Sequence, residues 1–540
     1  MTLRLHDVEV PVNEIPANAL LNKQIASMLE IPETMIRRVR ITKKSLDARR
    51  KARIVYHYQV DVDVDDESTV YQSKSTIASI SEPQASSDPL ADLDLNTVNF
   101  RHKPVIIGSG PSGIFAALTL SRAGQSCIVV ERGEPVEKRI KTTNKLRSRG
   151  IFTPESNYCF GEGGAGTFSD GKLTCGRNHP LINHVFDQFV KHGAPEDILY
   201  EAKPHIGTDF LIRIAKNMRT YLERSGTEFK FGRRFINFKS GGDNARYIVE
   251  LDNGEELATD HLVIAIGHSA RETYQMLLDR GLAIVPKPFA MGARFEHPQD
   301  VVNRIQFGSC KVPTAAEYKL AAQSGQRGIW TFCMCPGGHL MPTNAQEGHL
   351  AINGMSYNAR KSGFANAAVV VNVLREDFYR GHPLDGMRFQ AELEKIAFKA
   401  GGGNYHSPAQ KLKDFIAGRE SKGELQSTYK PGVNAARLDK ILPSFIVDAL
   451  KAGVQDYDKK MRGFICNESI VVGIESKTSS PISMMRGKDL QSISHPGIFP
   501  SGEGAGFAGG IVSAALDGVK TGRALVESVL SARVTGYLVH

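Results

Sequence analysis

Apolar and polar residues along this chain repeat with different periods, and the changes of period predict its elements. Residues 54–64 alternate apolar and polar side chains, which is typical of a half-buried strand. Further strands are predicted over residues 3–10 and 35–41, with a helix over 17–29 between them. The pattern therefore predicts a small α/β unit over residues 1–80.

The pattern of apolar and polar residues changes after that unit. Residues 81–99 are polar and contain prolines, which is typical of a linker. An apolar run at Val105–Ile107 then leads through glycines into a helical pattern over Ile114–Ala123, which Gly124 is expected to end. A second apolar run, Cys127–Val130, follows at once. A strand, a helix and another strand in this order predict a βαβ unit.

Three more strands are predicted over residues 228–238, 247–252 and 257–266. Asn253-Gly254 supplies the hairpin turn between the last two. Residues 286–464 mix strand and helix patterns. We interpret them as a second domain inserted into the first.

Composition supports a globular protein of several units. A chain of 540 residues is too long for one compact core, and 41% apolar with 23% charged residues is ordinary for folded proteins. The first residues are charged where a signal peptide would be apolar, and no run approaches a membrane span. We expect a soluble, cytoplasmic protein whose seven scattered cysteines are reduced.

The net charge of +9 is concentrated near the N-terminus, where nine lysines and arginines fall between Arg37 and Arg53. Runs of charge usually form a solvated face. Binding of nucleic acid or another polyanion is the alternative.

Residues 108–113, Gly-Ser-Gly-Pro-Ser-Gly, match the dinucleotide fingerprint G-x-G-x-x-G between a predicted strand and a predicted helix. The first glycine permits the tight turn, the second lets the backbone approach a pyrophosphate, and the third lets the helix pack on the strand. The helix N-terminus attracts phosphate. Glu131 ends the next strand, where a carboxylate binds ribose hydroxyls and repels a 2′-phosphate. The motif predicts FAD or NAD, not NADP.

Two later segments decide between FAD and NAD. Residues 262–267 form an apolar-Ala-x-Gly turn, and residues 497–506 precede a helical pattern over Ile511–Val529. With the fingerprint, they make the chain resemble the glutathione-reductase-like flavoprotein superfamily. The resemblance implies that the C-terminal turn binds the ribityl and phosphate end of FAD, although the usual aspartate is Glu503 here.

A physical argument leads to the same cofactor. A helix that begins after Gly509-Gly510 would direct its positive end at the pyrimidine end of a flavin, where negative charge collects on reduction. The expected FAD contacts are Gly108, Ser109, Gly110, Pro111, Ser112, Gly113, Glu131, Arg132, Gly163, Gly164, Ala165, Gly166, Phe235, Ala265, Gly267, Gly502, Glu503, Gly510 and Ile511.

A second glycine-rich stretch, residues 160–174, also fits G-x-G-x-x-G, but no good strand precedes it. We interpret it as a loop whose small residues lie against a flat ring. The chain resembles a largely uncharacterised family of bacterial FAD-dependent dehydrogenases over nearly its whole length. The motifs that carry this resemblance are the loop itself, the C-terminal turn and residues 45–49, 332–338, 353–357 and 475–481.

The resulting prediction is an α/β protein with a Rossmann-type FAD domain built from two chain segments. Its expected units are the small N-terminal domain 1–80, the linker 81–99, the first FAD-domain segment 100–285, the inserted α+β substrate domain 286–464 and the second FAD-domain segment 465–540.

The candidates for catalysis are Lys172, Cys335 and Arg360, and each has an ordinary alternative. Lys172 could hold a flavin oxygen or a substrate anion, or form a structural salt bridge. Cys335 and Cys333 could form a redox dithiol, although Cys-x-Cys is short for a relaxed bridge. Arg360, within the polar set Asn353, Ser356, Tyr357 and Asn358, could clamp an anion together with Arg486, or pair between domains.

We expect a hydride to pass between flavin N5 and a small organic substrate. Because only one fingerprint has the context of a nucleotide site, either NAD(P)H would enter the same cleft transiently or the organic substrate itself would reduce the flavin. The sixteen histidines lack metal-site spacing, so no metal is expected. One alternative is an FAD-containing RNA-binding or RNA-modifying protein that uses the basic N-terminal unit. Another is a flavin-binding regulator without turnover.

Overall fold

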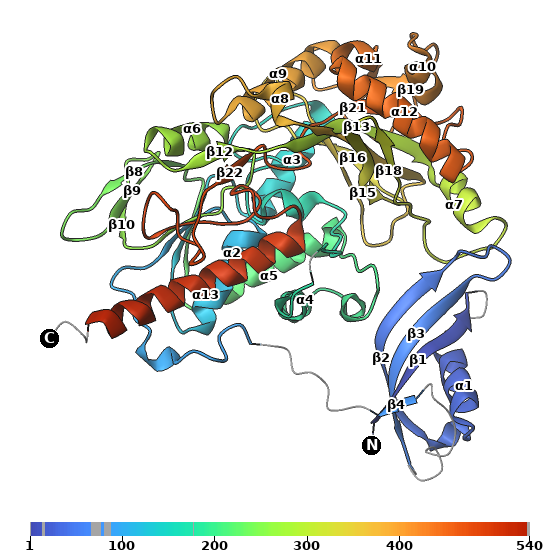
Figure 1. Ribbon diagram of the computed structural model, residues 1–540, viewed down its shortest axis with the longest axis horizontal. Helices are drawn as coiled ribbons and strands as arrows, with labels where there is room; N and C mark the ends of the chain where they lie inside the picture. Colours follow the sequence, from blue (N-terminus) through green and yellow to red (C-terminus); the bar gives the residue numbers. More distant parts are fainter. Residues whose placement is uncertain (1, 13–16, 66–76, 80–87, 177, 537–540) are drawn as a thin grey trace.

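The computed structural model describes residues 2–12, 17–65, 77–79, 88–176 and 178–536 (Figure 1). The part of the predicted linker over residues 81–87 lies outside this description. The N-terminal unit consists of β1 (Thr2–Pro11), α1 (Ala17–Leu29), β2 (Ile36–Asp47), β3 (Val55–Val64) and β4 (Ile77–Ser79), with sheet order β2-β3-β1-β4. The alternation in β3 places Val60 and Val62 in a core with Leu21 and Ile25 of α1.

A five-stranded parallel sheet forms the centre of the molecule. Its order is β23 (Ile498–Pro500), β11 (Leu262–Ile264), β5 (Val105–Ile107), β6 (Ile128–Glu131) and β7 (Glu228–Phe231). Helices α2 (Pro111–Arg122), α5 (Thr208–Arg224) and α13 (Ile511–Gly536) lie alongside one another against it (Figure 1). The structure confirms a mixed α/β protein with a parallel sheet.

Two predicted strands are each divided in the structure. The prediction of one strand over 228–238 is wrong, because Gly232 adopts a φ of +63° and separates β7 from β8 (Phe235–Ser240). The prediction over 257–266 is wrong for a similar reason, since the chain turns at Asp260 between β10 (Glu256–Thr259) and β11. In both cases the two halves join different sheets, and β8, β9 (Tyr247–Leu251) and β10 form an antiparallel sheet of their own.

The largest sheet has seven strands in the order β14-β15-β18-β13-β21-β19-β20. Their bounds are β13 Phe289–Pro298, β14 Ala321–Ser324, β15 Arg327–Cys335, β18 Phe364–Val373, β19 Ser407–Lys411, β20 Val433–Ala435 and β21 Ile470–Glu475. Helices α9 (Asp385–Ala400) and α12 (Ser444–Lys460) lie over this sheet, away from the parallel one (Figure 1). Ile329 of β15 packs against α12 in the main core. Trp330 and Phe332 of the same strand belong to a different cluster, in which they pack against Ala290, Ala368 and Val370.

The remaining elements connect these sheets. They are α3 (Val136–Arg149), α4 (Leu181–Lys191), α6 (Arg271–Asp279), β12 (Ile284–Pro286), α7 (Gln299–Phe307), β16 (His339–Pro342), β17 (Ile352–Met355), α8 (Arg375–Phe378), α10 (Leu412–Ala417), α11 (Leu438–Ile441) and β22 (Ile482–Met484). Within the described ranges, no helix is both long enough and apolar enough to cross a bilayer.

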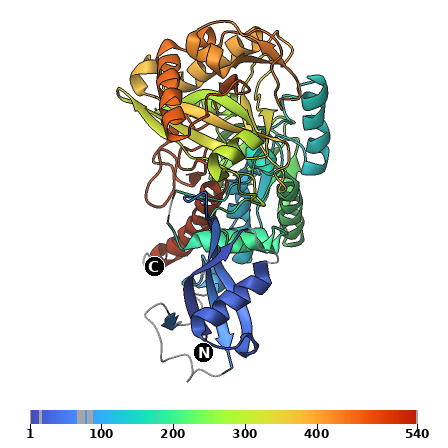
Figure 2. The same cartoon turned by 90° about the vertical axis from the view of Figure 1, so that its right-hand side faces the viewer.

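The N-terminal unit lies at one end of the molecule (Figure 2) and contacts the rest through β2 and through Val12 and Ile54, which are buried in the core of the seven-stranded sheet. The Lys44 N–H donates to Tyr200 O at 2.7 Å, and the Ala202 N–H donates to Lys44 O at 2.8 Å. The Lys44 ammonium lies 2.7 Å from Glu201. Several other cations of the basic segment are paired within the unit, including Arg40 with Asp61 at 2.5 Å.

Candidate functional site

A cavity of about 1050 Å³ lies where the carboxyl ends of β5, β6 and β11 face the seven-stranded sheet. Ligands of open parallel sheets bind at this edge. The volume slightly exceeds the range of roughly 300–1000 Å³ that is usual for the pocket of one small ligand. The cavity therefore has room for an extended cofactor and a second molecule beside it.

The three glycines of the fingerprint have different surroundings. Gly108 has a φ of +104°, and a Cβ on it would overlap Ala265 O. A Cβ on Gly113 would overlap Gly108 O, so this glycine permits α2 to pack on β5. At Gly110, in contrast, the nearest atom to an added Cβ is Gly164 Cα at 3.8 Å. The middle glycine thus leaves an open approach to the backbone from the cavity.

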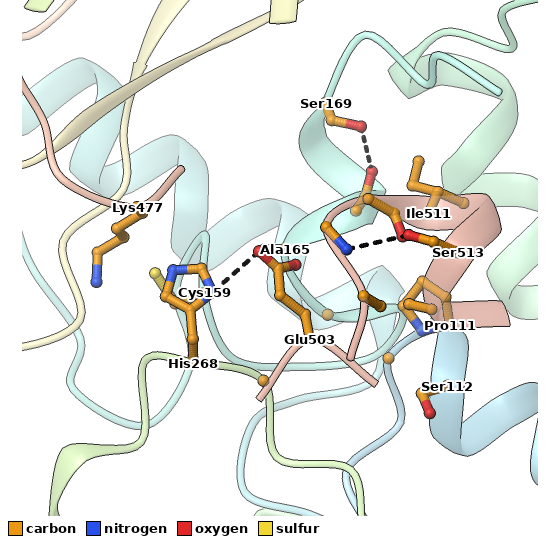
Figure 3. Close-up of a pocket in the computed structure, with 18 of the residues that line it drawn as sticks. Pro111, Ser112, Cys159, Ala165, Ser169, His268, Lys477, Glu503, Ile511 and Ser513 are labelled. Atoms are coloured by element: carbon orange, nitrogen blue, oxygen red, sulfur yellow. Dashed lines mark hydrogen bonds and ion pairs between the residues drawn. The ribbon is translucent and has the colours of Figure 1, made fainter. Parts of the chain in front are cut away.

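Two helices begin at this cavity. Gly110 is the N-cap of α2, and Gly510 immediately precedes α13. Nothing lies within 4 Å of a Cβ on Gly509 or Gly510, and the Gly509 N–H donates to Ser513 Oγ at 3.1 Å (Figure 3). Two positive helix ends at one glycine-lined slot suit a ligand with a pyrophosphate and a second electron-rich group. These residues fit FAD.

The second glycine-rich stretch closes the slot between these helices. It contains a short 3₁₀ helix over Gly164–Phe168, and the element directly before it in the described chain is a helix, α3. This agrees with the interpretation of the stretch as a loop and not as a second nucleotide site. A Cβ on Gly164 would lie 3.1 Å from Gly110 Cα, and one on Gly166 would lie 3.2 Å from Ile511 Cγ1. The buried Arg139 guanidinium holds the loop by donating to Glu162 O at 2.6 Å and Gly164 O at 2.8 Å. Burial lowers the pKa of Arg139 to about 10.

Glu131 reaches the cavity wall, but the protein itself satisfies its carboxylate. One oxygen accepts from the Ser109 N–H at 3.0 Å and the Ser109 hydroxyl at 2.8 Å, and the other accepts from Gly133 and Gly161 N–H groups at 2.9 Å. A ribose hydroxyl would have to replace one of these donors, so ribose binding stays a prediction. Arg132 stacks at 3.9 Å over Phe160.

Most of the expected FAD contacts line the cavity, and four lie behind its wall. The exceptions are Ser109, Gly113, Gly163 and Gly502. Gly163 donates its N–H to Ser109 O at 3.0 Å, and Gly502 donates its N–H to Asp517 at 2.7 Å. These four residues shape the turns that carry the others.

The structure adds a polar group that the sequence interpretation missed. His268 follows the apolar-Ala-x-Gly turn, and its Nδ1 lies 3.3 Å from the Glu503 carboxylate (Figure 3). Its side chain is 10% exposed, and its Nε2 has no hydrogen-bond partner in the described structure. The Thr343 and Thr478 hydroxyls on the same cavity wall are buried and unpartnered as well. The sequence feature that could have identified His268 as a site residue is its position directly after Gly267.

Lys172 and Arg360 come together at the far end of the cavity, where both pair with Asp170. The distances to the Asp170 carboxylate are 2.9 Å from Lys172 and 3.0 Å from Arg360, and the Ser356 hydroxyl donates to its other oxygen. Burial alone would raise the pKa of Asp170, but the two cations hold it well below its usual range. The salt bridge expected as the alternative for Lys172 is therefore present.

The two candidate cysteines lie near this cluster, close enough for electrostatic interaction with Lys172. Cys335 is buried behind the wall and donates to Cys333 O at 3.3 Å, whereas Cys333 lines the cavity. Both are free thiols. Asn353 accepts from the buried Arg294, and Arg486 pairs with Asp517 at 2.7 Å away from the cavity lining.

Comparison with known proteins shows where this chain has relatives. Residues 288–478 match the family described as "FAD-dependent protein, C-terminal domain-like", and residues 103–143 match the "FAD binding domain" family. Residues 2–63 match a "Domain of unknown function (DUF8436)". An uncharacterized protein of Clostridium beijerinckii is 41% identical over 539 residues, covering 98% of this chain and 99% of the relative.

Solved structures share only a distant likeness. A flavoprotein/dehydrogenase from Cytophaga hutchinsonii is 14% identical, with 80% of this chain and 79% of that chain covered and a TM-score of 0.34. A geranylgeranyl bacteriochlorophyll reductase-like protein from Thermoplasma acidophilum is 12% identical, with 80% and 79% covered and a TM-score of 0.35. Likenesses this distant carry no weight for the chemistry of the present chain.

Proposed function

The chain belongs to a family of FAD-dependent proteins, and from this premise we propose that it is an oxidoreductase that moves a hydride between FAD and a small organic substrate. The observation that carries the proposal is the continuity of the large cavity. It joins the glycine-lined slot at the starts of α2 and α13 to a second region beside β15.

Bound FAD supplies two-electron chemistry at its N5 atom, where a hydride is accepted or donated. The chain's contribution is to bind and orient. The N-terminus of α2 and the open backbone at Gly110 would hold the pyrophosphate, and the N-terminus of α13 would stabilise negative charge at the pyrimidine end. The loop over Gly164–Phe168 would cover the bound cofactor from the side of Gly110 and Ile511.

Hydride removal from an alcohol or amine also releases a proton, which needs an acceptor. We assign this role to His268, because this residue lines the cavity and its Nε2 has no hydrogen-bond partner among the described residues. The nearby Glu503 carboxylate would stabilise the imidazolium that forms. In the reverse direction, the same nitrogen would return the proton.

The electron partner would enter the substrate region of the cavity. Only the fingerprint at 108–113 has the strand and helix context of a nucleotide site in the described chain, so a nicotinamide donor would visit the cavity transiently. The RNA-binding alternative has no support from the relatives, and we do not propose it.

Anaerobic reduction of the bound flavin tests this function. We expect the purified protein to be yellow and to be bleached by NADH, NADPH or a member of a panel of small alcohols, amines and hydroxy acids. His268→Gln should keep its FAD but be reduced at least tenfold more slowly, because the proton acceptor is lost. His6→Gln, at an exposed position of β1, is the matched control and should be reduced at the wild-type rate.

Two results would contradict the proposal. A protein that binds FAD but is reduced by no donor in the panel would be a flavin-binding regulator and not an oxidoreductase. If His268→Gln were reduced as fast as the wild type, the proton would have another acceptor.

A further inference from the structure

The cavity contains more than the slot that fits FAD. Beyond it lie Trp330 and Phe332, two positions apart on β15, which is the spacing of side chains on one face of a strand. Both rings pack against the small side chains Ala290, Ala368 and Val370 and are only partly buried. Flat rings backed by small residues leave apolar surface on the cavity side, which suits another flat, apolar group.

Beside these rings, positive charge exceeds negative charge. Lys172 and Arg360 share one carboxylate, Asp170, whose side chain is fully buried. Lys203 pairs with Glu317, and both of these side chains also line the cavity. Lys203 is 72% exposed and forms a neutral pair with Glu317, so this pair adds no net charge. Lys172 and Arg360, in contrast, are 24% and 15% exposed and share one carboxylate, and this partly buried excess of positive charge favours an anion.

Two neighbouring groups respond to the excess positive charge. Burial alone would raise the pKa of Glu317, but Lys172 and then Lys203 hold it below its usual range. A hydrogen bond from Cys335, followed by the charges of Arg294 and Lys172, lowers the pKa of the Cys333 thiol. The field of Lys172 thus extends into the cavity and does not end at Asp170.

Arg360 also keeps free hydrogen-bonding capacity. One of its terminal nitrogens donates to Asp170, while its Nε is buried without a partner in the described structure. Its backbone has a φ of +50°, which a non-glycine residue rarely adopts. Each terminal nitrogen carries two hydrogens, so the guanidinium can donate further hydrogen bonds to a carboxylate.

From these contacts we propose that the substrate is a flat, unsaturated or aromatic carboxylate, with its ring against Trp330 and Phe332 and its carboxylate on Arg360 and Lys172. The inference rests on the proposed oxidoreductase function and names the substrate class of the same cavity. A carboxylate, with one negative charge, would balance the positive charge that Lys172 and Arg360 leave beyond Asp170.

Binding to the FAD-loaded protein tests the inference directly. Trp330 is the chain's only tryptophan, so intrinsic tryptophan fluorescence reports on this wall of the cavity alone, and the visible flavin spectrum reports independently. We expect benzoate to perturb both signals with a Kd at least tenfold lower than that of benzamide, which lacks the charge, or of acetate, which lacks the ring. Phenyl phosphate should bind more weakly than benzoate.

Variants separate the contribution of the charge from that of the fold. Arg360→Met should raise the Kd of benzoate at least tenfold and leave that of benzamide unchanged, and Arg360→Lys should restore part of the loss. Arg462→Met removes an exposed arginine elsewhere and serves as the control, with unchanged binding. Trp330→Leu, followed by the flavin spectrum, should weaken benzoate and benzamide alike.

The outcomes distinguish failure of the proposed substrate class from failure of the oxidoreductase function on which it rests. Equal affinity for benzoate and benzamide, tighter binding of phenyl phosphate, or no response to benzoate would overturn the substrate class even if donors still reduce the flavin. Charge-dependent benzoate binding to a protein whose flavin no donor reduces would retain the anion site and remove the oxidoreductase function.

Discussion

Gly110 and Gly113 belong to the same six-residue motif, yet a side chain at each would meet different surroundings. At Gly113 a Cβ would overlap Gly108 O, whereas at Gly110 the nearest atom, Gly164 Cα, is at an ordinary contact distance of 3.8 Å. One glycine is therefore required by the fold and the other by the ligand. The sequence motif alone does not show which glycine is required for folding and which for ligand binding.

Substitution at the two glycines should separate folding from cofactor binding. We expect Gly110→Val to fold normally and to lose its yellow colour, because the side chain would enter the space through which the pyrophosphate reaches the backbone. Gly113→Ala should lower the Tm even of protein freed of FAD, since the new methyl group overlaps backbone. Circular dichroism, thermal melting and flavin absorbance measure the two effects. Stoichiometric FAD in soluble Gly110→Val would show that the slot is assigned wrongly.

At the scale of an element, β13 shows how one strand serves two environments. Arg294 and Glu296 point to the same side of the strand, but Arg294 pairs with Glu475 at 2.8 Å, whereas no cation of the described residues pairs with Glu296. Glu296 is 1% exposed and accepts hydrogen bonds from Ser427 and Thr428. Burial raises its pKa to about 7 despite these donors.

This raised pKa predicts a pH-dependent stability. The folded protein holds the Glu296 proton more tightly than the unfolded chain, so the stabilisation is complete below about pH 4.5 and is lost as the pH rises through about 7. Between pH 5 and pH 7 the loss is about 2 kcal/mol at 1.36 kcal/mol per pKa unit. Glu296→Gln cannot ionise, so its Tm relative to wild type should rise between these two pH values. A constant difference would contradict the raised pKa.

At the scale of the whole molecule, the N-terminal unit adds its edge strand β2 to residues 200–202. This junction lies directly before Lys203, which lines the cavity. Its contacts combine two backbone hydrogen bonds with the ion pair between Lys44 and Glu201, whose side chains are 25% and 31% exposed. Such a pair is worth up to about 1 kcal/mol, and burial of Val12 and Ile54 in the core of the seven-stranded sheet adds a hydrophobic contribution to docking.

Charge reversal tests the junction. Lys44→Glu places two carboxylates opposite each other, and we expect faster hydrogen exchange at the amides of Lys44 and Ala202 with unchanged FAD content. The double variant Lys44→Glu with Glu201→Lys recreates the pair in reverse and should recover most of the protection. Unaltered exchange in the single variant would mean that the ion pair does not contribute to docking.

Local patterns predicted much of the architecture. The helix over residues 17–29 and the strand of residues 105–107 have the expected bounds, and the hairpin turn at Asn253-Gly254 is present, with a φ of +82° at Gly254. Each of these depends on the period or the conformational freedom of a few consecutive residues. The expected domain boundaries stay predictions.

The sequence by itself determined the cofactor class and the elements around the fingerprint, because glycines between a buried strand and a helix act over a few neighbouring positions. Only the tertiary structure decided which sheet each strand joins, that Lys172 and Arg360 meet at Asp170, and that His268 faces Glu503. The contacts of Arg360 with Asp170 and of His268 with Glu503 join residues far apart in the sequence. Their geometry follows from how the sheets pack, and no local period records it.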